Sequence, residues 1–285
     1  LQSIDSMGKV KDVGEGTIKR LREILETGNM EEISGLTGLK NGTKMKSMKE
    51  LCMVPGIGPA RARQLVAEKG IKGIDNLRDA VKEGLVELPH NIVTSLDCCS
   101  DLTVRIPRNE VEAIAAIVEG VAKKVSLKKF RKLGNLKVTV CGSYRRGKPT
   151  SGDVDILLHC ANGEHPPELL KNVVELLKDS GFLLGHLSEG QHKYMGICKL
   201  TESKMWKLPE DISAPYLARR LDIIYLPKSS LPTALLYFTG SGKFNIQFRK
   251  EALSKNYTLN EKGLFRINNP KEKRIIDAVN VTSER

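Results

Sequence analysis

No apolar run in this sequence approaches the ~18 residues that a membrane-spanning helix needs, and no hydrophobic stretch follows Leu1 as a signal peptide would require. We therefore expect an intracellular protein without a membrane span. None of the cysteines forms a C-x-x-C pair, and no histidine stands at zinc-ligand spacing from them. A zinc site is not predicted. The cysteines are expected to be reduced, mostly buried thiols: Cys52, Cys98, Cys99, Cys141, Cys160 and Cys198.

Acidic residues are in deficit. Lysine and arginine total 46 against 34 aspartates and glutamates, which gives a formal net charge of +12. This excess favours a polyanionic partner, with nucleic acid ahead of an anionic membrane. Charge alone leaves a second interpretation open, namely a basic protein without such a partner. Hydrophobic residues make up 40% of the 285 residues, which is enough to bury a core.

Helical and strand patterns occupy different parts of the chain. Helical periodicity dominates roughly the first hundred residues, whereas later segments include alternating or wholly apolar runs that are typical of strands. The tail begins with a helical stretch at Pro232 and is then expected to be irregular. An α+β fold is therefore predicted, with a helical part followed by a part built on a sheet. Helices are expected at residues 111–125 and 168–177, and strands at 136–141, 154–159 and 221–226.

Two glycine-containing segments near the N-terminus are alike. Residues 13–17 read VGEGT and residues 54–59 read VPGIGP, and each precedes a helical pattern; the turn-rich residues 35–43 separate them. Glycines let backbone N–H groups approach a DNA phosphate, and the following helix directs its dipole at the same anion. The second copy matches the helix-hairpin-helix consensus, so Gly56 and Gly58 are predicted to contact the DNA backbone. An ordinary helix–helix turn is the alternative.

Two carboxylates stand two residues apart at the start of a predicted strand. Strand alternation puts Asp153 and Asp155 on one face, where their charges repel unless a cation lies between them. A third carboxylate, Asp222, lies on a later apolar strand. Together they predict a site for two Mg²⁺ ions, replaceable by Mn²⁺, of the kind that supports in-line phosphoryl transfer. Solvated acids at a strand end are the alternative.

A phosphate-binding turn is predicted just upstream of these carboxylates. Residues 141–155 read CGSYRRGKPTSGDVD, so Gly142 and Ser143 follow a strand and precede Arg145 and Arg146. Bare backbone amides, one hydroxyl and guanidinium forks together suit a triphosphate. This turn and the third aspartate favour a nucleotide-transfer site over solvated acids.

This segment resembles the active-site motif of the family X DNA polymerases, in their beta and lambda branches. Further motifs follow in the family's order, with RIPR at residues 105–108, RLD at 220–222, YFTGS at 237–241 and FN at 244–245. The resemblance implies a DNA-directed DNA polymerase that fills short gaps in DNA repair, base excision repair included. It also implies four parts: a partial lyase-like segment with the first hairpin (1–47), a second hairpin subdomain (48–104), a catalytic palm (105–228) and a nucleotide-selecting, thumb-like subdomain (229–285).

The resemblance assigns roles to individual residues. Asp153, Asp155 and Asp222 would bind the metal ions, and Asp222 would help to activate the primer 3′-hydroxyl. The nucleotide would be bound by Arg105, Ser143, Arg146, Ser151, Gly152, Tyr237, Phe238, Gly240 and Asn245, with a cis peptide after Gly240. DNA would be bound by Gly56, Gly58, Arg220 and Arg249, while Na⁺ or K⁺ at the hairpin would be held by the carbonyls of Cys52, Val54 and Ile57. Glu261 would help to hold the closed thumb.

Three positions depart from the family pattern. Gly242 replaces a larger residue beside the incoming base, and Lys262 replaces a tyrosine that makes a thumb-closing contact. Arg20 stands at the position of the lyase lysine, and a guanidinium stays protonated and cannot form a Schiff base. The adjacent Lys19 is expected on a different helix face. The first hairpin is therefore expected to recognise a 5′-phosphate, and no 5′-deoxyribose-phosphate lyase activity is assigned.

The expected partners are gapped or primed DNA, deoxyribonucleoside triphosphates and other DNA-repair proteins. The chain is expected to act as a monomer in the nucleus, with the mitochondrion as the alternative compartment. Three other functions remain open: an RNA-end nucleotidyltransferase of the same superfamily, a non-catalytic DNA-binding scaffold, and template-independent terminal transfer within the family, for which the sequence offers no clear insertion loop. The hairpins and residues 237–240 argue against the first, and the three intact aspartates argue against the second.

Overall fold

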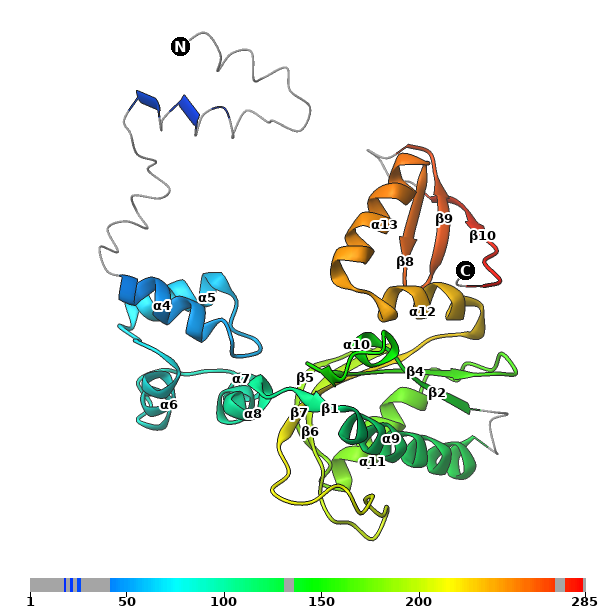
Figure 1. Cartoon of the computed structure of the whole chain (residues 1–285), viewed down its shortest axis with the longest axis horizontal. Helices are drawn as coiled ribbons and strands as arrows, with labels where there is room; N and C mark the ends of the chain where they lie inside the picture. Colours follow the sequence, from blue (N-terminus) through cyan, green and yellow to red (C-terminus); the bar gives the residue numbers. More distant parts are fainter. Residues whose placement is uncertain are drawn as a thin grey trace. The chain divides into compact units, whose positions relative to one another are not determined.

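The computed structural model describes residues 42–130, 136–269 and 275–283, together with single helical positions between residues 18 and 26. The chain forms two compact units, Leu1–Glu87 and Leu88–Arg285 (Figure 1). The first hairpin, with Lys19 and Arg20, lies outside the described residues. The predicted subdomain boundaries at residues 47, 104 and 228 stay predictions.

The described part of the smaller unit is helical, as predicted. Leu51, Ile57 and Leu65 are buried, and they hold two helices around a tight turn in a helix-hairpin-helix. The Glu50 carboxylate accepts a hydrogen bond from the backbone N–H of Ile74 (2.9 Å), which links the hairpin to the next helix. The helices are α4 (Gly42–Leu51), α5 (Pro59–Glu68) and α6 (Ile74–Lys82).

A five-stranded sheet forms the centre of the larger unit, with strand order β2-β4-β7-β6-β5. The pair β4 and β7 is parallel, and the other neighbours are antiparallel. The three predicted strands are confirmed, whereas β5 and β6 were not predicted. The strands are β2 (Leu136–Val140), β4 (Val154–Cys160), β5 (Leu183–Glu189), β6 (Lys193–Lys199) and β7 (Ala218–Tyr225).

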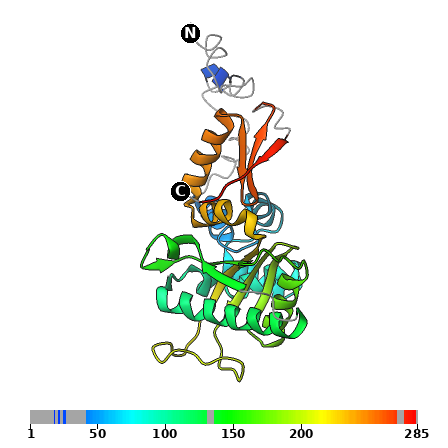
Figure 2. The ribbon, with the colours of Figure 1, turned by 90° about the vertical axis from the view of Figure 1, so that its right-hand side faces the viewer.

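Helices cover the two faces of this sheet unequally (Figures 1 and 2). The two predicted helices, α9 (Arg108–Lys129) and α11 (Leu169–Asp179), cover one face and share a core with Ile156 and Leu158 of β4. Leu157 points to the opposite face, in a smaller cluster with residues of α12. Burial on both faces explains the continuous apolar run of β4.

The C-terminal part departs from the irregular tail predicted from the sequence. Two helices are followed by a three-stranded antiparallel sheet of order β10-β9-β8. Each strand has only four or five residues, too short for a clear alternating pattern, so their pairing was not visible locally. The elements are α12 (Leu231–Thr239), α13 (Gly242–Ser254), β8 (Tyr257–Asn260), β9 (Gly263–Ile267) and β10 (Ile275–Val279).

A long irregular loop, residues 200–217, connects β6 and β7. The Trp206 ring meets Phe182 edge-on at 5.7 Å between centroids, which anchors the loop to the core.

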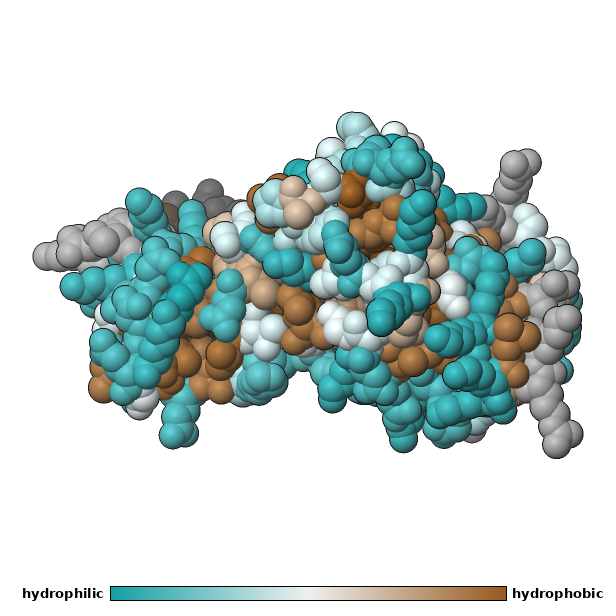
Figure 3. All heavy atoms as spheres, turned by 90° about the horizontal axis from the view of Figure 1, so that it is seen from below, coloured by the Kyte–Doolittle hydropathy of each residue, from teal (hydrophilic) through white to brown (hydrophobic). Residues whose placement is uncertain are grey.

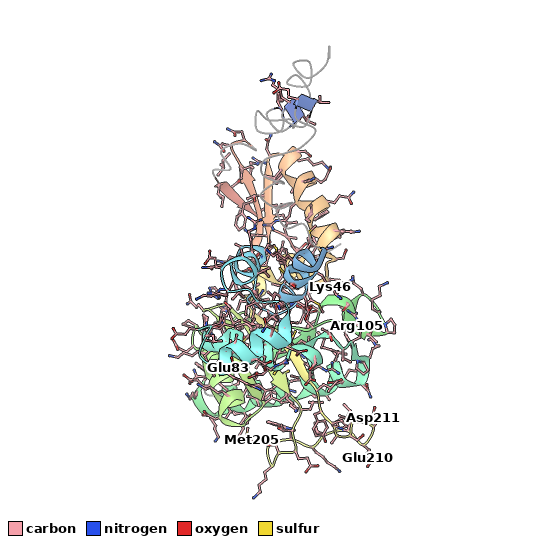
Figure 4. All side chains as sticks on the ribbon, turned by 90° about the vertical axis from the view of Figure 1, so that its left-hand side faces the viewer. Lys46, Glu83, Arg105, Met205, Glu210 and Asp211 are labelled. Carbon is pink, nitrogen blue, oxygen red and sulfur yellow. The ribbon has the colours of Figure 1, made fainter. Side chains whose placement is uncertain are left out.

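Hydrophilic side chains cover much of the face seen in Figure 3. Figure 4 shows side chains of this loop where it projects from the sheet: Met205, Glu210 and Asp211.

All six cysteines are free thiols and four of them are buried, as predicted. Within the described ranges, no helix has both the length and the hydrophobicity of a membrane span. The shorter elements of the larger unit are α7 (His90–Asp97), α8 (Cys99–Thr103), β1 (Ile106–Pro107), α10 (Gly142–Arg145), β3 (Thr150–Ser151) and a 3₁₀ turn (Lys228–Ser230).

Candidate active site

Asp155 and Asp222 lie opposite each other on neighbouring parallel strands. Asp155 is the second residue of β4, and its Cα partner on β7 is Asp222. Asp153 stands two residues before Asp155, just ahead of the first residue of the strand. The register therefore brings carboxylates from two distant stretches of sequence side by side near the start of β4.

Burial raises the pKa of two of these carboxylates, Asp155 and Asp222. The pKa of Asp155 is raised to about 7, first by burial and then by the charges of Asp153 and Asp222. Burial also raises the pKa of Asp222, whose Oδ1 atom is buried without a hydrogen-bond partner. A divalent cation would offset both effects, because it supplies positive charge and binds carboxylate oxygens. The donor set therefore fits Mg²⁺ or Mn²⁺.

Two basic side chains contact the carboxylates. Arg220, predicted to bind DNA, donates to Asp153, and its Nε atom lies 3.9 Å from Oδ1 of Asp222. Lys193 places its Nζ atom 3.5 Å from Oδ2 of Asp222. Among the described residues, no three acidic, histidine or cysteine side chains are gathered as a ligand cluster. The guanidinium of Arg220 instead contacts Asp153, just ahead of β4, and Asp222 on β7. Lys193 was missed from the sequence, because nothing local connects it with Asp222.

The predicted phosphate-binding turn begins at a glycine packed against Asp155. Gly142 has φ +56°, a left-handed conformation that favours glycine, and a Cβ atom there would overlap the Asp155 carboxylate. The turn then continues as the short helix α10, and the backbone N–H of Lys148 closes it on the Ser143 carbonyl (3.1 Å). Phosphate-binding turn here denotes residues 142–148. The structure thus places this turn directly beside the aspartates.

Arg105, Ser151 and Gly152 lie together on a second side of the site. Arg105 donates from Nη2 to the Thr150 carbonyl (2.7 Å) and from Nε to the Thr150 hydroxyl (3.2 Å). A Cβ atom on Gly152 would stand 3.0 Å from Nη1 of Arg105, so glycine allows this close approach. Ser151 is buried and pairs with Ile106 between β3 and β1. Figure 4 shows Arg105 among the labelled side chains of the larger unit.

The phosphate-binding turn also contacts the end of α12. Arg145 donates to the Thr239 hydroxyl (2.7 Å), and Arg146 donates to the Thr239 carbonyl (2.5 Å). The next peptide bond, between Gly240 and Ser241, is cis, as the resemblance predicted. Arg146 therefore lies where the predicted triphosphate and sugar contacts meet.

The predicted sugar and base contacts cluster around Tyr237. Its ring meets Phe238 edge-on with centroids 5.0 Å apart. The Asn245 amide donates to the Tyr237 carbonyl (2.7 Å), and the Arg249 guanidinium carbon lies 5.7 Å from the centre of the Tyr237 ring. Arg249 also donates to the Leu259 carbonyl (3.0 Å). The first turns of α13 and the end of α12 thus form one wall.

Two of the three positions that depart from the family pattern, Gly242 and Lys262, lie in the described C-terminal part, whereas Arg20 lies outside the described residues. Gly242 is the first residue of α13, and a Cβ atom there would meet no other atom within 4 Å. The turn after β8 contains Glu261 and Lys262, and the Lys262 carbonyl accepts a hydrogen bond from the Ser230 hydroxyl (2.8 Å). This contact involves the Lys262 backbone, so the predicted role of the Glu261 side chain stays a prediction.

The second hairpin belongs to the other compact unit. Gly56 has φ +94°, and Gly58 precedes α5 in an extended conformation. The Ile57 N–H donates to the Val54 carbonyl (3.0 Å), which forms the turn between the two helices. Pro59 has no N–H, so the backbone groups available at the start of α5 are those of Gly58 and the residues after the proline. The hairpin geometry predicted from the glycines is therefore present.

Three segments of the chain match protein-family models. Residues 48–90 match the SAM-like helix-hairpin-helix tandem. Residues 105–228 match the DNA polymerase beta palm, which includes all three aspartates, and residues 234–285 match the DNA polymerase beta thumb.

Individual proteins are also similar over most of the chain. DNA polymerase lambda from Rattus norvegicus is 30% identical over 260 residues, and that from Arabidopsis thaliana is 27% identical over 275 residues. The alignments cover 90% and 93% of this chain but only 40% and 47% of those proteins, so the chain spans less than half their length. The crystal structure of Leishmania infantum polymerase beta in a ternary P/T complex has a TM-score of 0.72 and 31% identity, covering 85% of this chain and 93% of that one.

Proposed function

The chain belongs to the family X DNA polymerases, and we propose that it adds deoxyribonucleotides to a primer 3′ end in short DNA gaps during repair. The observation that carries the proposal is the register between β4 and β7. It sets Asp155 opposite Asp222, beside a phosphate-binding turn whose first glycine packs against Asp155. Carboxylates next to a triphosphate site are the arrangement that nucleotidyl transfer requires.

In this proposal the three aspartates divide the work. Asp153 and Asp155 would hold both divalent ions, and Asp222 would hold one of them near the primer 3′-hydroxyl and would help to remove its proton. Two Mg²⁺ ions held there would supply the positive charge that stabilises the attacking and leaving oxygens. Arg220 donates to Asp153 here, so bound ions would compete with it for that carboxylate, and the DNA backbone would then be its natural partner.

The nucleotide lies between the phosphate-binding turn and the wall formed by α12 and α13. Backbone amides and the Ser143 hydroxyl, with Arg146 and Arg105, receive the triphosphate. Tyr237 and Phe238 lie beneath the sugar, where a 2′-hydroxyl would clash. Asn245 and Arg249 contact the base pair from the minor groove.

A gap-filling assay tests this function and separates it from RNA-end addition. We expect the chain to insert dCMP opposite guanine in a one-nucleotide gap and to use CTP at least about tenfold less efficiently, because one steric clash costs ~1.4 kcal/mol or more. The measurement is kcat/KM for dCTP and CTP on the same gapped DNA. Equal use of the two nucleotides, or addition to single-stranded RNA ends, would contradict the proposal.

We propose that the second hairpin binds the DNA backbone and holds Na⁺ or K⁺ through the carbonyls of Cys52, Val54 and Ile57. Replacing Gly58 by valine tests this without disturbing the fold, because φ is −86° and a Cβ atom would have open space. The valine would block the approach of a phosphate. Affinity for gapped DNA should fall about tenfold. The factor should be the same on all DNA sequences, since phosphate contacts carry no sequence information.

Gly120→Val is the matched control for this hairpin variant. Gly120 lies on α9, also with open space around a Cβ atom, and has no proposed DNA contact. Fluorescence anisotropy at several salt concentrations measures both variants. A loss that depends on the DNA sequence, or an equal loss in Gly120→Val, would refute a backbone contact.

We also propose partners, an oligomeric state and a compartment for this chain. Gapped DNA, deoxyribonucleoside triphosphates and other repair proteins are the proposed partners of a monomeric chain, and the nucleus is the proposed compartment. For the first hairpin we propose 5′-phosphate recognition without lyase activity, because arginine cannot supply the neutral amine that attacks an abasic sugar.

A further inference from the structure

Helix α9 contacts the phosphate-binding turn through side chains that have no role in the function proposed above. Arg108 and Glu112 stand one helical turn apart on α9, so both side chains emerge on one face. The Glu112 carboxylate accepts a hydrogen bond from the Tyr144 hydroxyl (2.6 Å). The Arg108 guanidinium carbon lies 3.7 Å above the centre of the Tyr144 ring. Tyr144 is thus held at its ring face and at its hydroxyl.

Arg108 also fixes the backbone of the turn. Its Nη1 atom donates to the carbonyls of Tyr144 (2.9 Å) and Lys148 (3.2 Å), which lie on either side of the basic pair. Gly142 and Gly147 have positive φ, so the turn contains residues with unusual backbone freedom. Contacts from a rigid helix would restrict that freedom and keep the backbone amides aimed in one direction.

We propose that Arg108, Glu112 and Tyr144 form a clamp that positions the phosphate-binding turn for the nucleotide triphosphate. The inference rests on the proposed function and extends it to residues that do not touch the nucleotide. Preorganised amides bind an anion without first losing conformational entropy. The clamp therefore acts on nucleotide affinity, whereas Asp222 acts on the rate of transfer.

The contacts of α9 with the core separate this role from a purely structural one. Val111, Ile114 and Val118 bury a different face of the helix against the sheet. Glu112 is exposed, so its loss removes little buried contact. Variants of the clamp should therefore retain the fold and differ in nucleotide binding.

The test is a double-mutant cycle between Tyr144→Phe and Glu112→Ala in gap filling. Each single variant should raise KM for dCTP about threefold to tenfold, the usual net value of one hydrogen bond, with kcat within about twofold of wild type. KM of the double variant should not exceed that of the more impaired single variant, because both substitutions remove the same hydrogen bond. Glu112→Gln keeps an acceptor and should restore most of the affinity. Arg108→Lys should not rescue the loss seen in Arg108→Ala, since an ammonium lacks the planar fork.

Glu119→Ala serves as the matched control. It removes a carboxylate from the same helix, one that pairs with Lys123 (2.6 Å) and has no contact of the kind that defines the clamp. KM for dCTP should stay at the wild-type value. Effects that multiply in the double variant, a fall in kcat at constant KM, or an equal rise in Glu119→Ala would overturn the clamp.

Equilibrium dialysis of dCTP with gapped DNA and a dideoxy-terminated primer distinguishes failure of the clamp from failure of the proposed function. If the wild-type protein binds dCTP but does not extend a normal primer, and Tyr144→Phe binds dCTP more weakly, the clamp is supported and the polymerase function is refuted. Extension by the wild type with equal binding by all variants would refute the clamp alone. Absence of dCTP binding by the wild type would refute both.

Discussion

Replacing Asp222 by alanine should remove primer extension while leaving nucleotide binding largely intact. Asp153 and Asp155 remain to hold the ion that accompanies the triphosphate, whereas the group nearest the primer hydroxyl is lost. The rate should fall by more than the hundredfold to thousandfold typical of one misplaced hydrogen-bond donor, that is, by about three orders of magnitude or more. Single-turnover extension and dCTP dialysis measure the two effects separately.

The fold should survive the Asp222 substitution, which distinguishes lost chemistry from lost structure. Burial raises the pKa of Asp222 in the folded chain, so ionising this carboxylate destabilises the fold at pH values above its unfolded pKa. Removing it should therefore not lower the melting temperature at neutral pH. Asp179→Ala, an exposed aspartate at the end of α11, is the control and should extend primers normally. Extension at the wild-type rate by Asp222→Ala would sink the assignment of the three aspartates.

Gly142→Ala should be nearly as damaging, although it removes no functional group. The left-handed backbone at φ +56° costs an alanine about 1–2 kcal/mol, and its Cβ atom would displace the Asp155 carboxylate. A displacement of roughly 1 Å in a site of this kind can cost about a hundredfold in rate. We expect that loss in kcat, measured by gap filling, with secondary structure unchanged by circular dichroism.

Gly147→Ala provides the matched control for this position. Gly147 lies in the same turn with φ +75°, but a Cβ atom there meets nothing within 4 Å. Gly147→Ala therefore carries the same cost of a left-handed backbone, but its Cβ atom collides with no neighbouring group. Equal losses in the two variants would show that turn strain alone is responsible, and would remove the packing of Gly142 on Asp155 from the account.

The parts of the site carried by local patterns were predictable from the sequence. The apolar runs that begin beside acids predicted β4 and β7, and the structure pairs Asp155 with Asp222 as a shared site requires. The glycines of the second hairpin predicted a tight turn between helices, which the structure confirms at Gly56. In each case the information lies within a few consecutive residues.

The missing parts depend on contacts between distant residues. Lys193 reaches Asp222 only because β6 pairs with β7, and no periodicity in either strand announces this. Glu112 faces Tyr144 across 32 positions of sequence. The short strands β8 to β10 are stabilised by pairing rather than by pattern. Composition and spacing could not reveal these contacts, because the residues that form them come together only once the chain has folded.

The central claim is that the three aspartates and the phosphate-binding turn perform metal-dependent nucleotidyl transfer on DNA. The most direct measurement is primer extension on one-nucleotide-gapped, nicked and blunt DNA, with and without Mg²⁺. We predict addition of the templated deoxyribonucleotide in the gap, dependent on Mg²⁺ and absent in Asp222→Ala. Normal binding to gapped DNA without any extension in Mg²⁺ or Mn²⁺ would contradict it, and would leave a DNA-binding scaffold.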